Sequence, residues 1–92
     1  MVLGLTFITV ESKGDSPREA FKLAIKKAKK ASNPMANKTD YIMASYNLLS
    51  PLEANLLASN LSETLPYSQK LGPLGCIRIS NTPKQYLFFG WV

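Results

Sequence analysis

The sequence contains no histidine and only one cysteine, Cys76, among its 92 residues. Without imidazole, the chain lacks the usual acid–base group at neutral pH and the commonest metal ligand. A single cysteine cannot form a disulfide within the chain, and a lone thiol suits a reducing compartment, so we expect a cytoplasmic protein. Cys76 begins an apolar segment, which favours a buried, structural thiol over a reactive one.

Patterns that carry catalysis are also missing. Apart from Asp15, Glu19 and Glu53, which lie at predicted helix starts, no two acidic residues are spaced for a catalytic pair or a metal site. The sequence also has neither a Walker A pattern nor Gly-x-Gly-x-x-Gly. Glu19 and Glu53 each stand three residues after a serine at a helix start, where glutamate acts as a capping residue. We therefore predict no catalytic residue, no metal site and no cofactor, and expect a protein that is not an enzyme.

Long hydrophobic runs are absent as well, and no segment approaches the roughly 20 apolar residues of a membrane span. Hydrophobic residues nevertheless make up 46% of the chain, which is enough for a folded core. The length fits one compact domain covering residues 1–92. We expect no membrane association.

Hydrophobic periodicity predicts the element order β-α-β-α-β-β. The segments are a strand over 2–11, a helix over 17–31, a strand over 41–46, a helix from 51 to about 65, and strands over 74–80 and 85–92. The last two strands read as a hairpin. We expect a two-layer sandwich of the α+β or α/β class, in which right-handed crossovers place both helices on one face of a four-stranded sheet. That placement assumes that both connections run the same way along the sheet.

Two segments 34 residues apart resemble each other. Residues 16–24, SPREAFKLA, match residues 50–58, SPLEANLLA, at six of nine positions. One interpretation is that Ser-Pro-x-Glu-Ala is simply a good helix start, with serine as the cap and proline in the first turn. The other is an internal duplication of a strand–helix unit.

Positive charge is concentrated in one segment of the chain. The formal net charge is +5, and five lysines fall within nine residues of the first predicted helix: Lys22, Lys26, Lys27, Lys29 and Lys30. Such a row can follow the phosphates of a nucleic acid. It can equally be a solvated helix face that keeps a small domain soluble.

The second half of the chain, in contrast, has few charges. Between residues 41 and 69 the only charged side chains are Glu53 and Glu63. Low charge together with retained aromatic residues is typical of a protein interface. As candidate interface residues we select Leu56, Tyr86, Phe88 and Trp91.

These observations predict a protein-interaction module that self-associates, most simply as a homodimer, and binds an acidic or apolar protein partner. The alternative is a small basic nucleic-acid-binding protein that uses the five lysines.

Overall fold

The computed structural model describes residues 6–69 and 72–92 of the chain. Its elements are β1 (Phe7–Lys13), α1 (Pro17–Lys30), a short 3₁₀ helix η1 (Pro34–Asn37), β2 (Tyr41–Ser45), α2 (Pro51–Leu61), β3 (Leu74–Asn81) and β4 (Lys84–Trp91). The predicted order β-α-β-α-β-β is confirmed. The first strand ends two residues later than predicted, and residues 2–5 of the prediction lie outside the described residues. Helix α2 ends at Leu61, before the predicted limit.

The four strands form one mixed sheet in the order β1-β4-β3-β2. Strand β4 pairs antiparallel with both β1 and β3, and β3 pairs parallel with β2. The predicted four-stranded sheet of an α+β protein and the hairpin between its last two strands are therefore confirmed. Strands β1 and β2 are the two edges of the sheet.

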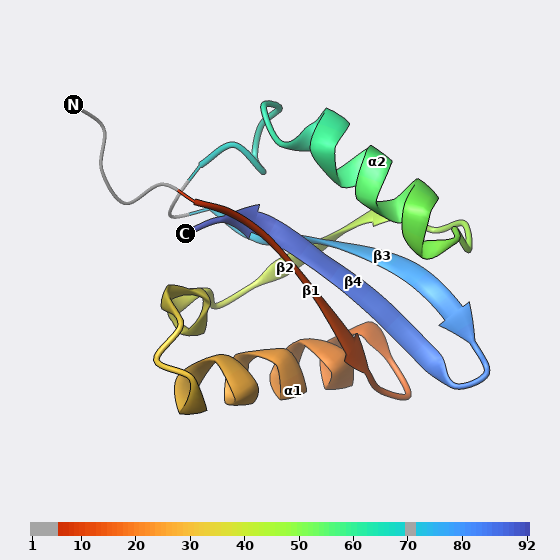
Figure 1. Ribbon diagram of the computed structural model, residues 1–92, viewed down its shortest axis with the longest axis horizontal. Helices are drawn as coiled ribbons and strands as arrows, with labels where there is room; N and C mark the ends of the chain where they lie inside the picture. Colours follow the sequence, from red (N-terminus) through yellow and green to blue (C-terminus); the bar gives the residue numbers. More distant parts are fainter. Residues whose placement is uncertain (1–5, 70–71) are drawn as a thin grey trace.

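The two helices lie on opposite faces of the sheet, so the predicted placement of both helices on one face is wrong (Figure 1). The reason is the direction of the two crossovers. From β1 the chain crosses to the far edge, β2, and from β2 it returns to β3. Because right-handed crossovers that run in opposite directions along a sheet place their helices on opposite faces, α1 and α2 are separated.

Each face of the sheet carries its own hydrophobic core. Tyr86 and Phe88 of β4 face α1, whereas Leu87 and Phe89 face α2. All four side chains are at most 2% exposed. Strands β3 and β4 are thus covered on both faces, as continuous apolar runs in central strands require. The low charge of these two strands therefore reflects burial within this one molecule.

The similarity between the two helix starts has a structural explanation. The Ser16 and Ser50 side chains each accept the backbone N–H three residues on, and the reciprocal bond of a full capping box is present at Ser50. The matched alanines then face the sheet: Ala20 and Ala24 in α1, and Ala54 and Ala58 in α2, are each no more than 1% exposed. Both helices need the same cap and the same small residues where they meet the sheet.

Candidate functional site

Six large hydrophobic side chains are exposed in the described chain, and all come from the segment between β2 and the turns that follow α2. We call them the apolar surface: Ile42, Tyr46, Leu48, Leu52, Leu56 and Leu65. Tyr46 is 82% exposed and Leu52 71% exposed, so these side chains have little cover within this molecule. No other element contributes a large hydrophobic side chain of comparable exposure among the described residues.

Helix α2 exposes leucines because it is apolar on more than one side. Ala54 and Ala58 pack on the sheet, with Leu57 and Leu61 beside them. Leu52 and Leu56 are four residues apart and therefore lie together on the opposite side of the helix. A surface helix normally carries charge there. In α2 the only charged residue is Glu53, in the first turn.

The structure exposes one of the predicted interface residues and buries the others partly or fully. Leu56 is 59% exposed and belongs to the apolar surface. Tyr86 and Phe88 cannot contact a partner, because α1 covers the face of β4 on which they lie, and that part of the prediction is wrong. Trp91 is half-buried, its ring 5.3 Å from that of Phe7, and its Nε1–H donates to the Ser62 carbonyl at 2.8 Å. It ties β4 to the end of α2.

All five predicted lysines of α1 are exposed, but they do not form one row. Lys22, Lys26 and Lys29 lie along the side of the helix that faces the segment leading into β2. Lys27 lies on the β1 side, where it lines a separate hollow with Val10. Lys30 lines neither hollow.

Three of these lysines border a hollow of about 430 Å³, which we call the lysine hollow. Its lining includes Phe21, Lys22, Ile25, Lys26, Lys29 and Lys38. Lys38 was not predicted, because it lies outside the helix, in the polar loop that follows it. Its side chain is 7% exposed, and its ammonium donates to the Gly72 carbonyl at 2.9 Å. Burial lowers the pKa of Lys38 from its usual value of 10.5.

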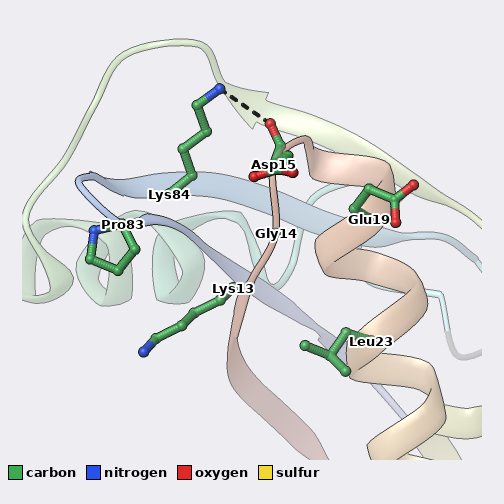
Figure 2. Close-up of a pocket in the computed structure, with 7 residues that line it drawn as sticks. All are labelled: Lys13, Gly14, Asp15, Glu19, Leu23, Pro83 and Lys84. Atoms are coloured by element: carbon green, nitrogen blue, oxygen red, sulfur yellow. Dashed lines mark hydrogen bonds between the residues drawn. The ribbon is translucent and has the colours of Figure 1, made fainter.

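A second hollow, of about 490 Å³, lies where the β3–β4 hairpin meets the turn between β1 and α1 (Figure 2). Here the Lys84 ammonium donates to the Asp15 backbone carbonyl at 3.3 Å, and the Lys13 side chain extends away from it. Gly14 has no room for a side chain, because a Cβ would meet the Ala20 nitrogen. Both signs of charge line this hollow, and its contacts serve to join the hairpin to the start of α1.

The chemistry available to a catalytic site is limited in the described residues. They contain no cluster of three or more cysteine or acidic side chains that could hold a metal ion. Cys76 is fully buried, and burial raises the pKa of its thiol from 9.0 to about 12, so the thiolate is not formed at neutral pH. Within residues 6–69 and 72–92 no helix is long and apolar enough to cross a membrane.

Comparison with known proteins finds no matching family model, no curated relative and no similar solved structure.

Proposed function

We propose that this protein is an interaction module that self-associates through the apolar surface on α2 and the loop that precedes it. The supporting observation is that all six exposed large hydrophobic side chains of the described residues lie between Ile42 and Leu65. Leu52 and Leu56 lie together on α2, and adjoining exposed apolar side chains mark interaction sites on soluble proteins. A reducing compartment such as the cytoplasm suits the unpaired Cys76.

A second copy of the chain fits this surface by its charge. The segment that carries the surface has only two charged side chains, Glu53 and Glu63, so two copies that meet there bring few like charges together. The lysines of α1 lie on the opposite face of the sheet (Figure 1). Two molecules joined through α2 therefore keep their basic helices on the outside of the dimer, where repulsion between them is weakest. A closed two-fold pairing also buries the same leucines on both subunits.

The test is sedimentation velocity from about 1 to 300 µM, a range that brackets micromolar affinities. The wild type should form a dimer, and Leu52→Asp/Leu56→Asp should be a monomer. Losing two buried leucines costs about 3 kcal/mol or more, which weakens association at least ~100-fold. Asn37→Asp adds one negative charge on an exposed site in η1, away from the apolar surface, and should leave the dimer intact. A wild type that stays monomeric throughout, or a dimer that survives both aspartates, would contradict the proposal.

The second candidate is nucleic-acid binding, favoured by the exposure of all five α1 lysines on a face remote from the apolar surface. In this case Lys26→Glu/Lys30→Glu should abolish binding to DNA or RNA at moderate salt, because phosphate contacts release counterions and are salt-dependent. Retained affinity in that variant would exclude the α1 lysines as the binding site.

A further inference from the structure

We propose that the lysine hollow binds a small phosphorylated molecule whose body is apolar or aromatic. The hollow combines two features that a surface lysine cluster alone does not have. Its floor is apolar, formed by Phe21 and Ile25, and four lysines are among the residues that line it. This inference does not depend on self-association, because the hollow and the apolar surface lie on opposite faces of the sheet.

The grouping of lysines around the hollow favours binding of an anion. Lys22, Lys26 and Lys29 follow one another by four and three residues, so neighbouring ammonium groups on this side of α1 repel each other. None of the described lining residues is acidic. The nearby Asp40 carboxylate accepts the Tyr41 backbone N–H at 2.7 Å. An anion in the hollow would relieve this repulsion, and a phosphate monoester, with close to two negative charges, matches several lysines better than a carboxylate does.

Lys38 contributes to the lining in a different way from the α1 lysines. It is almost fully buried, and its ammonium donates a hydrogen bond to the Gly72 carbonyl. The α1 lysines are exposed and can move their ammonium groups onto a bound phosphate. Capture of a compact anionic group therefore falls to the three exposed lysines of the hollow, Lys22, Lys26 and Lys29.

The floor and the volume define the rest of the ligand. Ile25 is half-buried at the surface of the hollow, and the apolar stems of the lysines extend its apolar lining. At about 430 Å³ the hollow is at the small end of ligand-binding cavities, which range over roughly 300–1,000 Å³. This space fits a single small molecule with a ring or short chain beside its phosphate.

Helix α1 supplies a matched pair of variants for the test. Lys22→Gln/Lys29→Gln removes two charges from the lining of the hollow, and Lys27→Gln/Lys30→Gln removes two charges from the same helix outside the hollow. The probes are phenyl phosphate, inorganic phosphate and glucose 6-phosphate, titrated into the full chain. Binding is followed by calorimetry and by the NMR signal of the Ile25 δ-methyl group.

Phenyl phosphate should bind more tightly than the other two probes and should shift the Ile25 methyl signal. The Lys22→Gln/Lys29→Gln variant should weaken its binding about tenfold or more, as expected for lost charge-assisted hydrogen bonds, and the control variant should stay within about twofold of wild type. Equal losses in both variants would overturn the proposal, as would an unmoved Ile25 signal. An oligonucleotide that depends equally on all the α1 lysines and displaces phenyl phosphate would also overturn it in favour of backbone binding.

Discussion

The close packing of Gly75 against Phe89 predicts that a larger residue at position 75 destabilises the core beneath α2. The two residues are direct partners across β3 and β4, and the Phe89 ring lies over the glycine. A methyl group at position 75 would overlap three ring atoms, the most distant of them, Cε2, at only 2.7 Å. Ordinary contact needs about 3.5–4.0 Å. The ring cannot easily retreat, because Tyr67 packs at 5.2 Å and Phe7 at 6.2 Å between centroids.

Gly75→Ala should therefore destabilise the fold by about 2–3 kcal/mol, near the upper end of ordinary overpacking costs. For a domain of this size the melting temperature should fall by roughly 10–20 °C. Gly90→Ala is the matched control, because a methyl group there meets the flexible tip of Leu74 at 2.8 Å and should cost about 1 kcal/mol or less. Phe89→Leu should reduce the cost of Gly75→Ala. Calorimetry that finds Gly75→Ala within about 3 °C of wild type would refute this packing.

Two further predictions concern Cys76 and Trp91. The raised pKa of Cys76 keeps the folded thiol protonated between pH 9 and about 12, where the unfolded thiol ionises. Stability should therefore fall by about 1.4 kcal/mol per pH unit in that window, and urea unfolding of Cys76→Ala should lack this contribution. Trp91→Phe removes the bond to the Ser62 carbonyl and should cost about 1 kcal/mol in the same assay, whereas an unchanged unfolding midpoint would contradict that bond's role.

Local features of the fold were predictable from sequence. Ser16-Pro17 and Ser50-Pro51 fix both helix starts to the residue, because a cap and a first-turn proline act within a few positions. The faces on which the helices pack were not predictable in the same way. They depend on the strand order β1-β4-β3-β2, which is set by pairing between segments far apart in the chain.

The same long-range order explains the mixed result for the candidate site. Tyr86 and Phe88 alternate with core residues along β4, so the sequence allows them to lie on an exposed face of the sheet. In the structure α1 covers that face. Leu56 was predictable because α2 carries more apolar residues than one buried stripe can use. The lysine hollow was not predictable, because it forms only where the loop that contains Lys38 folds back beside α1.

The separation of apolar and basic surfaces gives the two proposals independent tests. Burial of β3 and β4 on both faces accounts for the low charge in the last third of the chain. Burial does not account for the exposed hydrophobic side chains of the apolar surface. Helix α1, which carries the basic residues, lies on the other face of the sheet from α2 (Figure 1). Aspartates at Leu52 and Leu56 should therefore leave phenyl phosphate binding unchanged, and glutamines at Lys22 and Lys29 should leave the oligomeric state unchanged. If either pair altered both properties, the two surfaces would not act separately as argued.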